Sequence, residues 1–119
     1  MKEAIMWLAK AARDLVAGKI NLGQNLFDIS AFLSHQAAEK ALKALYIARF
    51  KRLWKIHDLE KLALSLDADE NILKYCRELN PHYIASRYQL DLKYSKKVSE
   101  DALKCSKAIV EWATKKLKK

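Results

Sequence analysis

The chain has 119 residues, of which 51% are hydrophobic and 31% charged, enough for one domain with a substantial core. Two glycines and one proline argue against a β-sandwich or a loop-rich fold, and usage dominated by Ala, Leu, Lys, Ile and Glu favours helix. The net charge of +9 favours an acidic partner such as nucleic acid, a nucleotide or an acidic protein, although a solubilising lysine-rich surface gives the same count. We therefore predict a single all-α domain over residues 1–119, an up-and-down four-helix bundle with an additional short helix.

The first helix is predicted from about Lys2 to Leu22. Its inner side is expected to carry apolar residues at helical spacing, namely Ile5, Leu8, Ala9, Ala12, Leu15, Val16 and Ile20. Gly23 is expected to end this helix in the left-handed conformation, and Asn25 to cap the next one. The short linker between them predicts an antiparallel helical hairpin.

The second helix, from about Leu26 to Phe50, is apolar on two sides and is predicted to lie at the centre of the bundle. A narrow polar strip runs between those sides and consists of His35, Gln36, Glu39, Lys40 and Lys43. Because buried polar groups are costly without partners, the strip should hold this helix against its neighbours or line a cleft. His35 and Glu39 have the spacing of two metal ligands, but no second pair accompanies them, so no metal site is expected.

Basic residues gather where the second helix ends, where cations complement the helix dipole: Arg49, Lys51, Arg52 and Lys55. Asp58 is predicted to cap a short helix over Leu59–Leu66, and another helix is predicted over Glu70–Leu79. The latter should direct its apolar residues inward, namely Ile72, Leu73, Cys76 and Leu79. Asn80 should end it, because the residue before a proline is disfavoured in the α region.

Residues 82–94 show no clean helical period and are expected to form an ordered, irregular connection. This stretch places Arg87 among aromatic and imidazole side chains: His82, Tyr83, Tyr88 and Tyr94. An arginine can bind phosphate through two parallel hydrogen bonds, and a tyrosine can stack on a base. The combination suits a nucleotide or RNA site, although the same residues could serve only to fix a helix end.

The last helix is predicted from about Ser95 to Leu117, with an inner stripe of Val98, Ala102, Cys105, Ile109, Trp112 and Ala113. Cys76 and Cys105 lack a zinc or CxxC spacing and are expected to be buried thiols in a reducing cytosol. No signal peptide and no membrane-spanning apolar run is visible, which predicts a cytoplasmic protein. No cofactor is expected, since the two glycines cannot form a phosphate-binding loop.

Three motifs, taken in this order, resemble those of HEPN-domain proteins: HQAAEKALKALY at 35–46, KIHDLEKL at 55–62 and LNPHYIASRY at 79–88. The resemblance covers nearly the whole chain, from Trp7 to Trp112. It implies a helical bundle that commonly forms homodimers and binds a nucleotide or RNA. It also implies a partner, a separately encoded minimal nucleotidyltransferase.

The candidate nucleotide- or RNA-binding residues are Arg87, Tyr88 and His82 of the stretch described above, with His35, Glu39 and Lys40 of the polar strip as one wall of a cleft near Arg87. Some HEPN proteins are metal-independent ribonuclease toxins whose signature is an Arg followed after four to six residues by His, with two copies meeting across the dimer. Here the corresponding positions hold Leu92, Lys93 and Tyr94, and none is His. Arg87 and Tyr94 would be the catalytic pair of such a toxin, and a non-catalytic structural dimer subunit is the third alternative.

Overall fold

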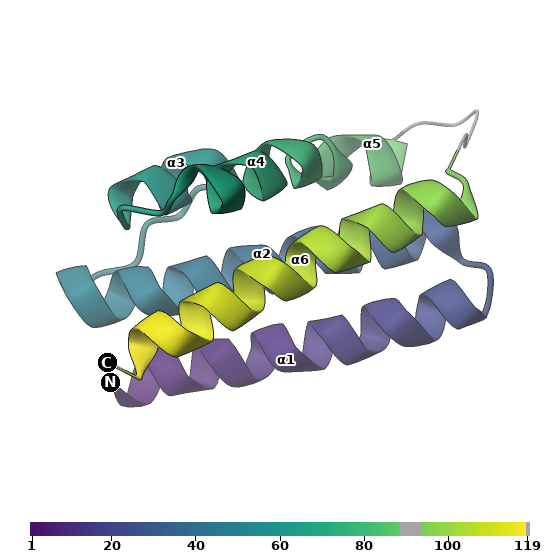
Figure 1. Cartoon of the computed structure of the whole chain (residues 1–119). Helices are drawn as coiled ribbons and strands as arrows, with labels where there is room; N and C mark the ends of the chain where they lie inside the picture. The colour runs from purple at the N-terminus through teal and green to yellow at the C-terminus, as the bar shows by residue number, and fades with distance from the viewer. Residues whose placement is uncertain (89–93, 119) are drawn as a thin grey trace.

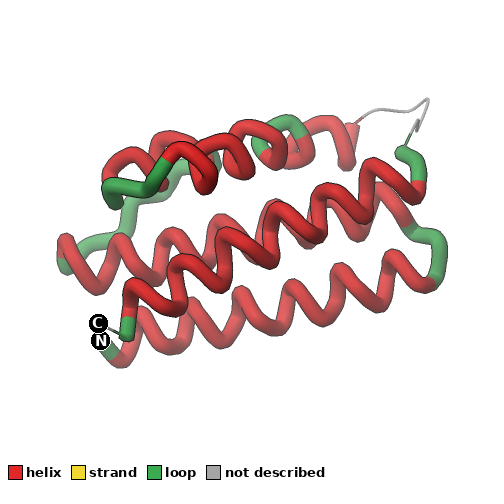
Figure 2. The backbone as a smooth tube through the Cα atoms, viewed as in Figure 1, coloured by secondary structure: helices red, strands yellow, loops and turns green. Residues whose placement is uncertain are grey.

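The computed structural model describes residues 1–88 and 94–118, and within these ranges it contains helices and no strands (Figure 2). The helices are α1 (Lys2–Gly23), α2 (Phe27–Phe50), α3 (Leu59–Ser65), α4 (Glu70–Leu79), α5 (His82–Tyr88) and α6 (Lys96–Leu117). Three long helices fill three positions of a bundle, while α3, α4 and α5 follow one another along the fourth (Figure 1). The predicted all-α bundle is confirmed, although three helices, α3, α4 and α5, stand where two were expected.

The second helix lies at the centre, as its apolar sides predicted. Its residues contact α1, α6, α5 and α3, and most positions from Ala37 to Ile47 are buried. The helix begins one residue later than expected and ends at Phe50, as predicted. Every other long element therefore packs on α2, which fixes where side chains on α2 meet side chains from distant parts of the chain.

The turn between α1 and α2 uses a different residue from the one expected. Gly23 is the last residue of α1, and Asn25 adopts the left-handed conformation with φ of 62°. Asparagine is among the few residues other than glycine that visit this region readily. The backbone N–H of Leu26 then donates to the carbonyl of Asn21, and α2 begins without a side-chain cap. The roles predicted for Gly23 and Asn25 are therefore wrong, although the helical hairpin itself is confirmed.

The inner face of α1 is made of small residues seven positions apart, Ala4, Ala11 and Gly18, all of them buried. Small residues let the helix axes approach closely, and the Ser30 hydroxyl donates to the Gly18 carbonyl over 2.8 Å. Most of the stripe predicted to face inward is instead exposed: Ile5, Ala9, Ala12, Val16 and Ile20. The exposed fractions of Ile5 and Val16 are 56% and 59%. The prediction was wrong because α1 has two apolar stripes and packs on the one with smaller side chains.

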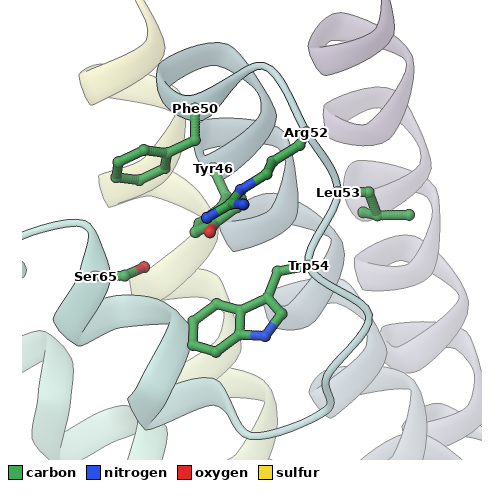
Figure 3. A pocket seen from close by; sticks show the side chains of 6 residues that line it. All are labelled: Tyr46, Phe50, Arg52, Leu53, Trp54 and Ser65. Carbon is green, nitrogen blue, oxygen red and sulfur yellow. The ribbon is translucent and has the colours of Figure 1, made fainter.

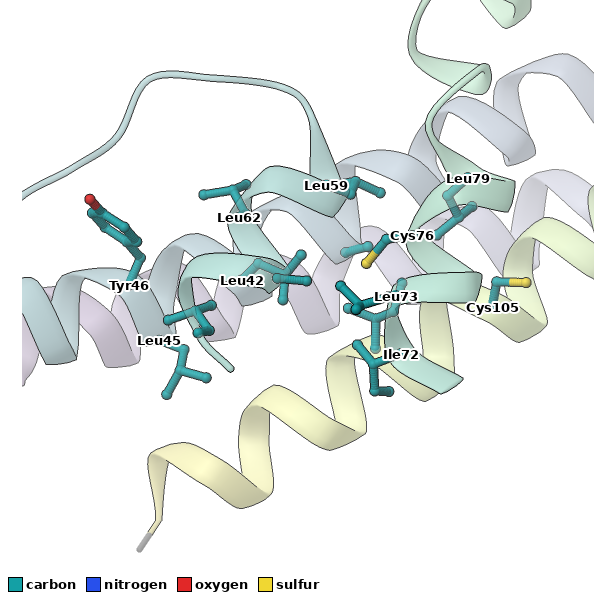
Figure 4. Packing of buried hydrophobic residues seen from close by; sticks show 14 of the residues in the cluster. Leu42, Leu45, Tyr46, Leu59, Leu62, Ile72, Leu73, Cys76, Leu79 and Cys105 are labelled. Carbon is teal, nitrogen blue, oxygen red and sulfur yellow. The ribbon is translucent and has the colours of Figure 1, made fainter. Parts of the chain in front are cut away.

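The main core joins α2, α3, α4 and α6 (Figure 4). Its largest contributors include Leu42, Leu59, Leu62, Leu79 and Ile109. The range predicted for α4 and all four of its inward residues are confirmed. Cys76 and Cys105 are buried free thiols, and burial raises the pKa of each to about 12, so both stay protonated at neutral pH.

The inner face of α6 differs from the prediction at its first turn. Val98 is 38% exposed, and the neighbouring Ser99 is buried in its place. The Ser99 hydroxyl donates to the carbonyl of Phe27, so a small polar residue allows close contact with the start of α2. Farther along, Ile109 and Ala113 are buried as predicted, while Trp112 is half-buried against the core.

Two polar side chains tie the start of α3 to the end of α4. Asp58 caps α3, as predicted, by accepting hydrogen bonds from two backbone N–H groups of its first turn at 3.0 and 3.2 Å. Asn80 keeps an α conformation in spite of the following proline, with φ of −49° and ψ of −44°, which the sequence did not predict. Its side chain accepts from the Leu59 N–H (2.8 Å) and donates to Asp58 (2.9 Å). These bonds fix the start of α3 and with it His57, the residue just before Asp58.

Candidate functional site

The stretch after Pro81 forms a short helix, α5, so the irregular connection predicted for residues 82–88 is wrong. Proline is tolerated in the first turn of a helix, and the Pro81 carbonyl accepts from the backbone N–H groups of Ile84 and Ala85. Pro81 therefore begins α5 as well as following α4. Leu92 and Lys93, which hold two of the positions where the ribonuclease signature would place a His, lie outside the described residues.

Arg87 lies on α5 with its guanidinium among three aromatic rings. The central carbon of the guanidinium is 4.4 Å from the ring centre of Tyr83, 5.0 Å from that of Tyr88 and 5.1 Å from that of Phe32 on α2. The Arg87 Nε donates to the Tyr83 carbonyl over 2.8 Å. Within the described part of the chain, no ion pair or hydrogen bond engages its two terminal nitrogens. Arg87 is thus an exposed cation whose position is fixed and whose charge has no counter-ion among residues 1–88 and 94–118.

A chain of contacts joins Tyr83 to a buried ion pair. The Tyr83 ring stacks on His57 with ring centres 4.2 Å apart and an interplanar angle of 16°. The His57 Nδ1–H donates to Glu39 Oε1 (2.8 Å), and Lys43 Nζ donates to Glu39 Oε2 (3.0 Å). Glu39 and Lys43 are each 5% exposed, whereas half of the His57 side chain is exposed. The buried Glu39 carboxylate therefore orients an imidazole that itself reaches solvent beside Tyr83.

His35 supports the same segment from within the core. It is fully buried, its Nε2 bonds to the His57 carbonyl over 3.2 Å, and its Nδ1 has no hydrogen-bond partner within the described ranges. Burial lowers the pKa of His35 to about 4, against a partial opposing effect of the Glu39 carboxylate 4.0 Å away. At neutral pH the ring is uncharged, so His35 fixes the His57 backbone without adding positive charge to the site.

A shallow cleft of about 300 Å³ opens beside these residues. It is lined by His57, Asp58, Asn80, Pro81, Tyr83 and Ile84. The cleft therefore shares His57 and Tyr83 with the contacts just described, and two other lining residues, Asp58 and Asn80, are hydrogen-bonded to each other.

Two predicted site residues lie elsewhere. Lys40 faces α1, where its Nζ is 2.5 Å from Asp14 Oδ2, so it joins two helices of the bundle. His82 bonds the Tyr94 hydroxyl over 2.7 Å. Burial lowers the pKa of His82 and, together with the charge of Asp28, raises that of Tyr94, so both groups are neutral at pH 7. No hydrogen bond or cation–π contact joins Tyr94 to Arg87 in the described residues.

The site contains residues to which sequence reasoning gave no role, namely His57 and Phe32. His57 belongs to the KIHDLEKL motif, which was the only signal available for it. No sequence pattern points to a role for Phe32 in the site, because its contact with Arg87 depends on how α5 lies across α2. Glu39 and Arg87 were expected to share a site, and they are linked here through His57 and Tyr83.

Neither a metal site nor a membrane span is found among the residues that the structure describes. No three His, Cys, Asp or Glu side chains converge closely enough to hold a metal ion. No helix combines the length and the apolar character that crossing a bilayer requires.

Comparison with known proteins gives a family match and three similar structures. The family model described as HEPN domain matches residues 4–117. The crystal structure of TT1696 from Thermus thermophilus is 27% identical, with a TM-score of 0.90 over 98% of this chain and 99% of that one. ST0689, an archaeal HEPN homologue, is 24% identical, with a TM-score of 0.83 over 98% and 99% of the two chains.

The third similar structure is an HEPN domain protein from Thermotoga maritima, tm0613. It is 22% identical, with a TM-score of 0.79 over 96% of this chain and 98% of that one. No curated protein matches the sequence. Each of the three structures is matched over nearly its full length, so the similarity extends to the whole bundle.

Proposed function

This chain belongs to the HEPN-domain family, and from that membership we propose that it is a nucleotide- or RNA-binding subunit acting with a separately encoded minimal nucleotidyltransferase. The observation that carries the proposal is the exposed Arg87 guanidinium, held on aromatic rings with its terminal nitrogens free of partners in the described part of the chain. The proposed nucleotidyltransferase rests on the family resemblance, and a neighbouring gene for such an enzyme would support it.

The surroundings of Arg87 suit a phosphate and a base together. A planar guanidinium fixed by stacking is pre-organised to donate two parallel hydrogen bonds to a phosphate. Tyr88 lies beside it with its ring exposed, and exposed aromatic rings stack on bases regardless of sequence. His57 adds a half-exposed ring on the other side of Tyr83. Arg87 would hold the phosphate, while Tyr88 would contact the base.

Replacing Arg87 with Ala should weaken binding of a short single-stranded RNA or a nucleotide by about tenfold or more, since hydrogen bonds to charged groups contribute ~1.5–3 kcal/mol. Isothermal titration calorimetry at fixed salt measures this. Arg13→Ala is the matched control, because Arg13 is exposed on α1 and its loss changes the net charge equally. Equal affinities of the two variants would contradict the Arg87 site, and no binding by the unsubstituted protein would contradict the function.

A metal-independent ribonuclease is the second candidate, and one observation favours it. The sequence lacks a His at the expected positions after Arg87, but His57 lies near Arg87, with Tyr83 in contact with both side chains. The Glu39 carboxylate accepts the His57 Nδ1–H, so Nε2 is the ring atom of His57 that could exchange a proton with bound RNA. The titrated RNA samples, analysed by electrophoresis in the presence of a chelator, would show cleavage if this candidate is correct.

The homodimer that the family resemblance implies finds support in the exposed stripe of α1. Ile5, Ala9, Ala12, Val16 and Ile20 follow one another along a narrow line of this helix and are all exposed. Such a contiguous apolar face favours an interface, and alanines at its middle would let a second α1 approach closely. Since α1 and α5 lie on opposite sides of the bundle, each Arg87 site would then be complete within one subunit (Figure 1).

Val16→Glu should convert such a dimer to a monomer, because a carboxylate on the stripe would be buried in the interface without a partner. Light scattering should then change from about twice the chain mass of 13.7 kDa to that mass itself. Lys10→Glu, on α1 but outside the stripe, should leave the dimer intact. A monomeric unsubstituted protein at micromolar concentration would exclude the dimer.

A further inference from the structure

A second cleft, larger than the one beside His57, lies where α2 ends. Its volume is about 590 Å³, within the range of small-molecule sites. It is lined by Tyr46, Phe50, Arg52, Leu53, Trp54 and Ser65 (Figure 3). Tyr46 and Phe50 come from α2, Ser65 from α3, and the others from the segment that connects these helices. No part of the proposed function uses this cleft.

Three aromatic rings form one wall of the cleft. The Tyr46 ring centre is 4.6 Å from that of Phe50 and 5.6 Å from that of Trp54. Lys51 ends α2 in the left-handed conformation, with φ of 59°, which turns the chain so that Trp54 lies beside Tyr46. Tyr46 is buried in the core, whereas Phe50 is 44% exposed. The wall therefore contains one buried ring, which is fixed by packing, and one ring that solvent and a ligand can reach.

The basic residues around this cleft divide into two kinds. Arg49 and Lys51 bond to backbone carbonyls, those of Leu66 and Ala48, each over 2.9 Å, so they have structural roles at the helix end. Arg52 makes no hydrogen bond or ion pair in the part of the chain that the structure describes. Its side chain extends into the cleft toward Tyr46 (Figure 3). Residues 46–55 contain no acidic side chain, and none of the six residues that line the cleft is acidic.

We propose that this cleft is a nucleotide site, which takes either a free nucleotide or one nucleotide of a single-stranded RNA. The base stacks on the aromatic wall at Trp54 and Phe50, and the phosphate binds the Arg52 guanidinium. A ligand with both a flat ring and a negative charge uses both halves of the cleft, whereas an acidic peptide would use only the arginine.

The proposal goes beyond the function assigned to Arg87, because the two sites lie at different ends of α2. Phe32, which contacts Arg87, and Phe50 are eighteen residues apart on this helix, which corresponds to about 27 Å along its axis. A single mononucleotide cannot contact both sites. Each site can therefore be tested with the other intact.

Tryptophan fluorescence provides a direct test, since Trp54 lines the cleft and only Trp7 and Trp112 need to be replaced to isolate its signal. The Trp7→Phe/Trp112→Phe protein is titrated with adenosine monophosphate and, separately, with a short oligoadenylate. A saturable change in Trp54 emission is expected. A response to the mononucleotide identifies a free nucleotide as the ligand, whereas a response to the oligonucleotide alone identifies RNA.

Arg52→Ala in this background should weaken binding by about tenfold or more. Lys55→Ala is the matched control, because it removes one charge from the same segment without removing a residue that lines the cleft. Arg87→Ala should leave the Trp54 response unchanged, which separates this site from the proposed function. No emission change, equal losses in the Arg52 and Lys55 variants, or equally good competition by oligoglutamate would overturn the proposal.

Discussion

Replacing Glu39 with Ala is expected to lower the free energy of unfolding by about 3–5 kcal/mol, the usual cost of removing one partner from a buried ion pair. Lys43 is 5% exposed and its ammonium bonds Glu39 Oε2, so the variant would leave a buried cation without a counter-ion. His57 would also lose the acceptor of its Nδ1–H. Urea unfolding measures the loss, and the melting temperature should fall by more than about 10 °C.

A second substitution tests whether the stranded charge causes this loss. In the Glu39→Leu/Lys43→Met double variant both charges are replaced by apolar groups of similar size, so much of the lost stability should return. A double variant less stable than Glu39→Ala would contradict that cause. An unchanged melting temperature in Glu39→Ala, combined with lost RNA binding, would instead place Glu39 among the ligand contacts.

The parts of the fold that the sequence predicted correctly depend on local chemistry. Asp58 caps its helix through backbone groups two and three residues away, and the four inward residues of α4 share one face of a short amphipathic helix. The central position of α2 follows from its lack of a wide polar face. Each of these features depends on residues close together in the sequence, so it can be recognised without knowing which distant residues are in contact.

The orientation of α1 and the nature of residues 82–88 needed information from elsewhere in the fold. Two stripes of α1 are apolar, and the one that packs inward carries the small residues Ala4, Ala11 and Gly18, with Gly18 held close to Ser30 of α2. Residues 82–88 make fewer than two helical turns, too short for a period to be recognised, and a proline such as Pro81 can either follow the end of a helix or begin one. Local patterns therefore found the helices more reliably than they found how those helices pack.

In the candidate site, too, the contacts between residues near in sequence were predictable, and those between distant residues were not. Tyr83 lies four residues before Arg87 on one helix, so its contact with Arg87 was predictable from spacing, while Tyr88 is the next residue in the sequence. Phe32 and His57 reach the site from α2 and from the segment before α3, through contacts that no spacing encodes. Glu39 belongs to both groups of contacts. Its place in the polar strip of α2 was predicted from spacing, whereas its bond to His57 was not.

The buried His35 should make the protein less stable in acid. Its pKa is about 4 in the folded state, compared with about 6.5 for an exposed histidine, because burial disfavours the charged ring. Between these values the unfolded chain binds more protons than the folded chain, so stability falls as the pH is lowered from 6.5 to 4 and the loss from this group then levels off. The depressed pKa corresponds to about 3 kcal/mol.

His35→Gln isolates this contribution. The Glu39 carboxylate, His57 and Tyr83 face His35 and are retained, while the titrating ring is removed. The variant should be less stable than the unsubstituted protein at pH 7, because the bond to the His57 carbonyl is altered, but its stability should fall less steeply between pH 6.5 and 4. Urea unfolding at several pH values gives both slopes. Parallel slopes would mean that the Glu39 carboxylate compensates the protonated ring fully, and that the acid sensitivity of the strip arises from another group.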